Sequence, residues 1–151
     1  MIATIKALSD LSKKLNQKSD RLNDTIESIN QKLEDLNLGV ETWLTGSPID
    51  RSDPYYDYNK NASVPVRDET WLGYLRFPDA SGWALAAKVV TLNERDRVIL
   101  DGEPARPLLN MSRNIRVKAM KLIPELLDAI KDTAEELLQS IDGAEEAAKN
   151  L

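Results

Sequence analysis

The side chains best suited to chemistry are acids in the middle of the chain. They occur in pairs: Asp50 with Asp53, Asp68 with Glu69, Glu94 with Asp96, and Asp101 with Glu103. Two carboxylates can hydrolyse a glycosidic bond or hold Mg²⁺ or Ca²⁺. Nothing in the spacing singles out one pair, and residues 50–57 lack the ligand order and the glycine of an EF-hand loop. We therefore expect no catalytic residue, no metal site and no cofactor.

A tyrosine-rich segment lies beside the first acid pair. Its candidate contact residues are Tyr55, Tyr56, Tyr58, Asp53 and Asp57. Tyrosine presents a rigid apolar ring with a polar tip, which suits a recognition surface. Two interpretations stay open: the rings contact a partner or ligand, or they pack onto a sheet that is short of core residues.

The residue types that are missing narrow the chemistry further. The chain has no cysteine and no histidine. The absence of cysteine excludes disulfides, zinc–thiolate sites and thiol nucleophiles, and the absence of histidine removes the usual general base and zinc ligand. The net charge of −5 disfavours nonspecific attraction to nucleic acid or anionic lipid. No apolar run approaches the ~18 residues of a membrane span, and no signal peptide is evident, so we expect a cytoplasmic protein.

The first element that must position these residues is a long N-terminal helix. Apolar residues recur at heptad spacing, which is typical of a coiled coil. The seam residues are Leu8, Leu15, Ser19, Leu22, Ile26, Ile29, Leu33 and Leu36. Gly39 follows and is a suitable C-terminal cap.

The last part of the chain predicts a second long helix. It begins near Asn110 or Ser112, either of which can cap it. Its seam residues are Ile123, Leu127, Ile130, Ala134, Leu137 and Ile141. The apolar stripe changes at Pro124, which predicts a kink where the helix passes from one packing partner to another.

Both terminal segments begin basic and end acidic. Residues 1–18 and 111–124 carry mainly Lys and Arg, whereas residues 19–38 and 125–151 carry mainly Asp and Glu. Antiparallel packing would pair each basic half with an acidic half. We therefore predict a two-helix antiparallel coiled-coil hairpin, with Ser19 opposite Ala134 and Ser12 opposite Ile141. Pairing of the first helix with its own copy satisfies the same charges, so self-association through the helices stays open.

A basic cluster opens the last helix: Arg113, Arg116, Lys118 and Lys121. These side chains form either a phosphate site or the partners of Glu34 and Asp35 across the hairpin. We favour the second interpretation, because the cluster has no interleaved aromatic residues and no nucleic-acid-binding motif.

The middle of the chain differs in kind from the ends. Its β-branched and aromatic content predicts strands at 40–44, 70–77, 83–92 and 97–100, with turns at 78–82 and 93–96. Residues 47–68 show no period and predict a long loop. The predicted fold is α+β: a helical stalk of residues 1–38 plus 111–151, with an inserted antiparallel β head of three or four strands at 39–110.

Two classes of function follow from this architecture. The first is a non-enzymatic interaction or scaffold protein, in which the stalk is a spacer and the β head contacts a protein partner. The alternative is a small-ligand-binding or hydrolytic α+β domain with its site between residues 47–68 and the sheet. An exposed apolar strip on the helices favours the first, and a concave pocket with convergent acids favours the second.

Overall fold

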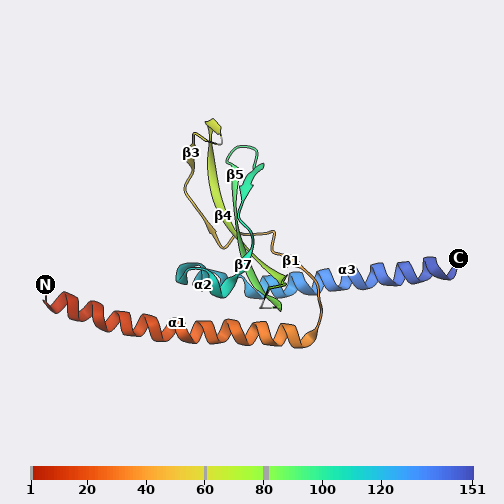
Figure 1. Ribbon diagram of the computed structural model, residues 1–151, viewed down its shortest axis with the longest axis horizontal. Coiled ribbons are helices and arrows are strands. Elements are labelled where there is room, and N and C mark those ends of the chain that lie inside the picture. Colours follow the sequence, from red (N-terminus) through yellow and green to blue (C-terminus); the bar gives the residue numbers. More distant parts are fainter. Residues whose placement is uncertain (1, 60, 80–81) are drawn as a thin grey trace.

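The computed structural model describes residues 2–59, 61–79 and 82–151, and for residues 61–63 it describes the backbone alone. Within these residues lie three α-helices, one short 3₁₀ helix and one seven-stranded antiparallel sheet (Figure 1). In chain order the elements are α1 (Ile2–Leu36), β1 (Thr42–Trp43), β2 (Asp50–Arg51), β3 (Tyr55–Asp57), β4 (Asn61–Phe77), β5 (Gly82–Asn93), β6 (Ile99–Gly102), β7 (Arg106–Pro107), the 3₁₀ helix Leu108–Asn110, α2 (Arg113–Met120) and α3 (Ile123–Lys149). This content confirms the α+β class.

The sheet is built on one long hairpin with interrupted edges. β4 and β5 pair without a break from Val66 opposite Asn93 to Phe77 opposite Gly82. Short strands β1, β2 and β3 line the free edge of β4, and β6 and β7 line that of β5. The expectation of three or four strands was therefore too low. Prolines occur along both edges and interrupt them. A proline has no N–H group to donate to a neighbouring strand, so it is confined to strand ends and edges.

The predicted loop at 47–68 contains regular structure. It holds β2, β3 and the first part of β4, and both short strands pair with β4. The sequence predicts β4 only from Thr70 because Pro65 argues against a strand. Pro65 lies beyond the residues that pair with β5, in a stretch where the pairing of β3 with β4 shifts register. Residues 80–81 of the predicted turn at 78–82 lie outside the described residues.

The helix ends follow local rules. Ser112 caps α2, and its side chain accepts a hydrogen bond from the backbone N–H of Ile115. The predicted kink near Pro124 is a break: α2 ends at Met120, and Pro124 lies in the first turn of α3, where its missing N–H costs little. At the end of α1, Asn37 rather than Gly39 is the first residue with a positive φ, at 52°.

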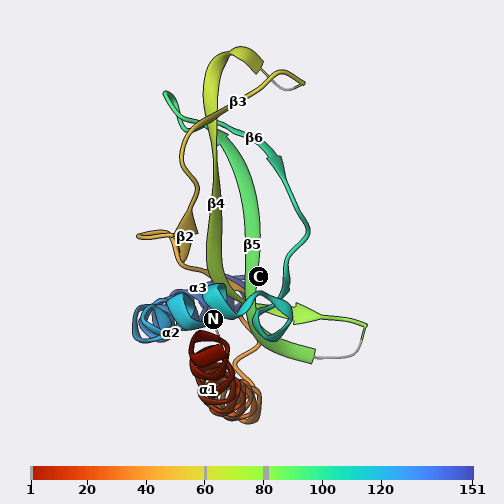
Figure 2. The ribbon, with the colours of Figure 1, turned by 90° about the vertical axis from the view of Figure 1, so that its left-hand side faces the viewer.

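The long helices α1 and α3 run in the same direction, and α1 lies alongside α2 and the start of α3 (Figures 1 and 2). The side-chain contacts agree. Asn16 bonds to Arg113 near the start of the overlap, whereas Leu33 lines a groove with Ile130 near its end. The predicted antiparallel coiled-coil hairpin is therefore not confirmed. The charge pattern failed to predict the direction because it does not require both partners to belong to one molecule.

One hydrophobic cluster joins helices and sheet. It combines Ile26 and Leu33 of α1 and Leu126 of α3 with Leu72 and Leu85 of the hairpin, all buried. Leu72 and Leu85 lie on the face of the sheet that packs on the helices. In addition, the side-chain oxygen of Asn30 on α1 accepts a hydrogen bond from the backbone N–H of Leu85, 2.8 Å away. The helices and the lower half of the hairpin are therefore one packed unit.

Candidate functional site

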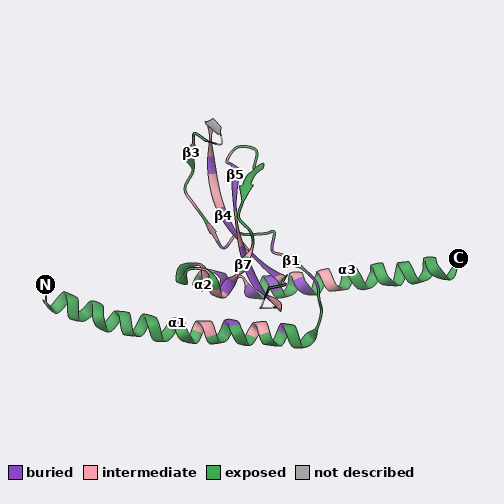
Figure 3. Cartoon of the chain, in the orientation of Figure 1, coloured by how far each residue is buried: buried purple, intermediate pink, exposed green. Residues whose placement is uncertain are grey.

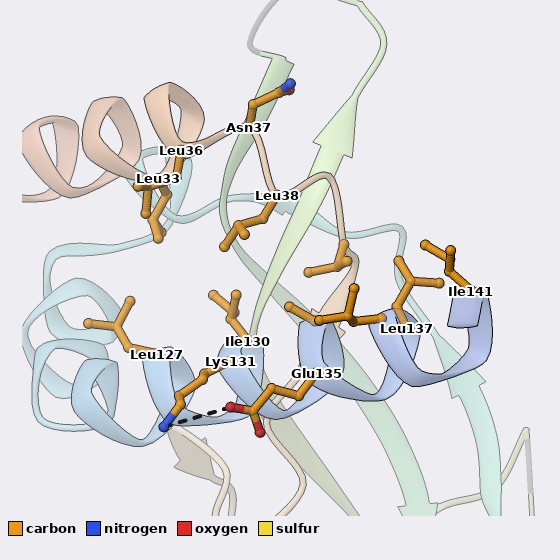
Figure 4. A pocket seen from close by; sticks show the side chains of 13 residues that line it. Leu33, Leu36, Asn37, Leu38, Leu127, Ile130, Lys131, Glu135, Leu137 and Ile141 are labelled. Carbon is orange, nitrogen blue, oxygen red and sulfur yellow. Dashed lines mark ion pairs between the residues drawn. The ribbon is translucent and has the colours of Figure 1, made fainter. Parts of the chain in front are cut away.

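An apolar groove of about 600 Å³ lies where α1 ends and α3 continues (Figure 4). Leu33 and Leu36 of α1 form one wall, and Leu38 follows from the connection to the sheet. The α3 wall consists of Leu127, Ile130, Lys131, Ala134, Glu135, Leu137, Leu138 and Ile141. Its main charged residues, Lys131 and Glu135, pair with each other at 3.9 Å. The groove therefore suits an apolar occupant.

Each long helix extends past the packed region as an exposed arm (Figure 3). We call residues 2–15 of α1 the N-terminal arm and residues 135–149 of α3 the C-terminal arm. Both arms are exposed along their whole length. Their large apolar side chains are Ile2, Ile5, Leu8, Leu11 and Leu15 on the first and Leu137, Leu138 and Ile141 on the second. Such stripes on both arms are typical of helices that pack against a further partner.

The predicted seam residues divide into two groups. Ser19, Ile26, Leu33, Ile123 and Ile130 are buried, and Leu22, Ile29 and Ala134 pack against the core in part. Leu8, Leu15, Leu36, Leu127, Leu137 and Ile141 are exposed. The seam residues of the central turns are therefore mostly buried, with Leu127 as an exception, whereas Leu8, Leu15, Leu137 and Ile141 of the outer turns are exposed.

The basic cluster on α2 does not meet Glu34 and Asp35 as the sequence predicts. Arg113 donates a hydrogen bond to the side-chain oxygen of Asn16 over 2.9 Å, and Arg116 donates one to that of Asn23. Lys118 pairs with Asp50 at 2.8 Å, and its hydrogen bond lowers the pKa of that carboxyl despite partial burial. The parallel arrangement thus places α2 alongside the middle of α1, near Asn16 and Asn23. Among the described residues, no ion pair joins α1 to α2 or α3.

The tyrosine-rich segment forms an edge of the sheet. Tyr55 lies in β3, and its hydroxyl group donates to the carboxylate of Asp68 at 3.0 Å. Tyr56 and Tyr58 are exposed, and the carboxylate of Asp57 accepts a hydrogen bond from the backbone N–H of Asn59. Asp53 is exposed just before the strand. Tyr55 therefore has a structural contact, and the exposed rings of Tyr56 and Tyr58 are free of the core.

The most buried charge in the head is the carboxylate of Glu69. Its side chain is 0% exposed and lies between two arginines, with Arg51 Nε at 2.7 Å and Arg97 Nη2 at 2.9 Å. Burial raises the pKa of Glu69, but the hydrogen bonds and charges of Arg97 and Arg51 outweigh it and hold the pKa below its usual value. The arrangement links β2, β4 and the turn before β6. No sequence signal pointed to it, because Glu69 is one acid among many.

A cavity of about 330 Å³ opens beside Glu69 on the sheet face that points away from the helices. Trp43, Trp71 and Lys88 line it, together with Arg97. The Lys88 ammonium lies 4.1 Å from the centre of the Trp43 ring, a cation–π contact. The acid and the cations of this cavity thus already have partners within the chain.

A smaller cavity of about 200 Å³ brings together acids of two predicted pairs. Asp68, Asp101 and Glu103 line it. The Asp68 carboxylate accepts hydrogen bonds from the hydroxyl groups of Tyr55 and Thr91, the latter over 2.6 Å. These bonds explain Asp68 as a structural residue. Across the described part of the chain, no three His, Cys, Asp or Glu side chains cluster in a way that suits a metal ion.

Comparison with known proteins adds no information on this site. No protein-family model, no curated protein and no solved structure matches this chain. Among the described residues, none of the helices combines the length and apolar character needed to cross a bilayer.

Proposed function

We propose that the protein is a non-enzymatic cytoplasmic interaction or scaffold protein whose working surface is its helical base. The observation that carries this proposal is the apolar groove between the end of α1 and α3, which continues into the exposed stripe of the C-terminal arm. Helix-in-groove binding uses apolar anchors at this spacing. In this proposal the base, formed by α1, α2 and α3, acts as the spacer in place of the predicted antiparallel hairpin. The β head projects from it.

The head supplies a second contact surface in this proposal. Tyr56 and Tyr58 are exposed at its edge, and exposed tyrosines are common in protein interfaces. The buried ion pairs of Glu69 hold the neighbouring strands and turn together, so the edge is presented on a fixed support. A protein partner fits both surfaces better than a small ligand.

The alternative of a ligand-binding or hydrolytic site near residues 47–68 has less support. Asp68 and Glu69, which line the two cavities described above, are both engaged in hydrogen bonds within the chain. A general acid or nucleophile needs a carboxylate that can reach a substrate. Neither cavity of the head offers one from this pair.

Site-specific photo-crosslinking in the producing cells tests the proposal. A benzoylphenylalanine in place of Leu137 lies in the groove, whereas one in place of Gln139 lies about 200° further around the same helix and serves as the matched control. We expect discrete adducts from position 137 and none from position 139. Equal labelling, or no adduct at either position, contradicts the proposed function.

A further inference from the structure

We infer that the N-terminal arm of a second copy of this chain occupies the groove and continues along the C-terminal arm, so that copies associate head to tail. This inference rests on the proposed function, because it names the partner of the same helical surface. Three observations carry it: the placement of the arms, their charges and the direction of the helices.

The arms are placed so that one begins where the other lacks a neighbour. α1 ends at Leu36 beside the groove, and α3 continues alone past Ile141 (Figures 1 and 4). A second α1 laid in line with the first would therefore enter the groove where α1 ends and cover Leu137, Leu138 and Ile141. In return it buries its own exposed stripe, which includes Ile5 and Leu8, 60% and 59% exposed in the single chain.

The charges of the two arms are complementary. The N-terminal arm carries Lys6, Lys13 and Lys14 against Asp10. The C-terminal arm carries five acids against one lysine, namely Glu135, Glu136, Asp142, Glu145 and Glu146 against Lys149. Within one molecule these arms point away from each other (Figure 1). Only a second copy brings them together, and such charge matching steers the association.

The helix direction selects an open arrangement over a closed one. Copies displaced along the helices keep α1 and α3 parallel, as they are within one chain, and keep their β heads on the same side without overlap. A two-fold dimer that joined the same arms would instead lay the later halves of α1 side by side, and residues 20–35 of that helix are rich in Asp and Glu. Head-to-tail contacts of this kind build linear assemblies unless they close into a ring.

Charge reversal on purified full-length protein tests the inference. One variant carries Lys6→Glu, Lys13→Glu and Lys14→Glu, a second carries Glu136→Lys, Glu145→Lys and Glu146→Lys, and a third carries all six substitutions. All six side chains are exposed and none forms an ion pair within the described part of the chain, so we expect the variants to fold. Circular dichroism verifies this.

Sedimentation velocity at low salt then reads out the assembly. We expect the mass of the wild-type assembly to rise with protein concentration beyond that of a dimer. Each single-arm variant should associate at least tenfold more weakly. The six-fold variant regains association, because its arms are again opposite in charge. Salt above ~0.1 M should weaken the association of the wild-type protein and of the six-fold variant alike. A wild-type chain that stays at 16.9 kDa, or a six-fold variant that does not recover, overturns the inference.

The cysteine-free chain allows a test of geometry. Because Leu33 and Ile130 lie together in the groove, a second helix that starts where α1 ends brings its eighth residue level with Ile141. Leu8→Cys combined with Ile141→Cys should give a disulfide-linked ladder beyond the dimer, whereas either substitution alone stops at the dimer. A double variant that stops at the dimer overturns the head-to-tail arrangement. If purified protein fails both tests while position 137 still gives adducts with other proteins, this inference falls and the proposed function stands.

Discussion

Gly73 lies directly under the indole ring of Trp43: a Cβ atom at this position would come within 3.0 Å of three ring carbons. β1 and β4 pair at these two residues, so the backbone pairing fixes Trp43 directly opposite Gly73. The glycine therefore allows the tryptophan to lie flat on the sheet and to meet Lys88.

Replacing Gly73 by alanine should destabilise the protein by about 1–3 kcal/mol, the usual cost of forcing an extra methyl group into packed surroundings. Urea denaturation followed by tryptophan fluorescence measures the change. Gly143→Ala is the matched control, because nothing lies within 4 Å of a Cβ there and the residue is inside α3. That control should be stabilising by about 0.5–1 kcal/mol. If both variants behave alike, the Trp43 packing is wrong.

Glu69→Gln should weaken the fold by about 1–3 kcal/mol at neutral pH, because hydrogen bonds to charged partners are lost. Since the folded pKa of Glu69 lies below the ordinary 4.5, the stability from its charge is fully present above that pH. It disappears as the pH falls through the folded pKa. Denaturation of wild-type and variant between pH 7 and pH 3 should therefore show a difference that narrows below 4.5. Glu94→Gln, at a more exposed pair with Arg67, should cost only ~0–1 kcal/mol.

Truncation of two residues from the same predicted seam should change the stability by very different amounts. Ile26 is 0% exposed in the core, so Ile26→Ala should cost about 2–5 kcal/mol. Leu8→Ala, on the exposed arm, should change stability by less than ~0.5 kcal/mol. Both are measured on dilute protein in high salt, where arms of different copies are apart. A large loss from Leu8→Ala would mean that the N-terminal arm packs within its own chain.

Cross-linking should establish the helix direction. Asn16→Cys with Arg113→Cys places two thiols on facing turns of α1 and α2 and should be bridged within one chain by a short bismaleimide. Ser19→Cys with Ala134→Cys, opposite each other in the antiparallel hairpin, should not be bridged within one chain. If only the second pair is bridged within one chain, the helices are antiparallel and the arrangement described here is wrong. Electrophoresis of dilute cross-linked samples distinguishes the results.

Local features were predictable from the sequence, whereas the relation between distant elements was not. Ser112 has the side chain of a helix cap, and the spacing of Ile26 and Leu33 fixes the buried face of α1, because both effects act over one or two helical turns. The direction of α3 depends on how its first turns pack on the sheet. Charge pairs contribute too little to decide it.

The head shows the same division. β5 was recognised almost to the residue, because its apolar and β-branched composition is a local property. The sequence did not predict the start of β4, because Pro65 is a poor strand residue. A proline is tolerated there because the pairing of β4 with β5 ends at the next residue, Val66, opposite Asn93. The burial of Glu69 requires Arg51 and Arg97, which are far apart in sequence, to converge on one carboxylate.

The shared hydrophobic cluster has a consequence for the chain as a unit of folding. Since Ile26, Leu85 and Leu126 come from three separate stretches of sequence and bury one another, no cut between helix and sheet leaves a fragment with a finished interior. The molecule should melt in a single cooperative transition, with only the outer ends of its two long helices fraying earlier. Without the helices the β head would expose the buried face that carries Leu85, so we do not expect it to fold as an independent module.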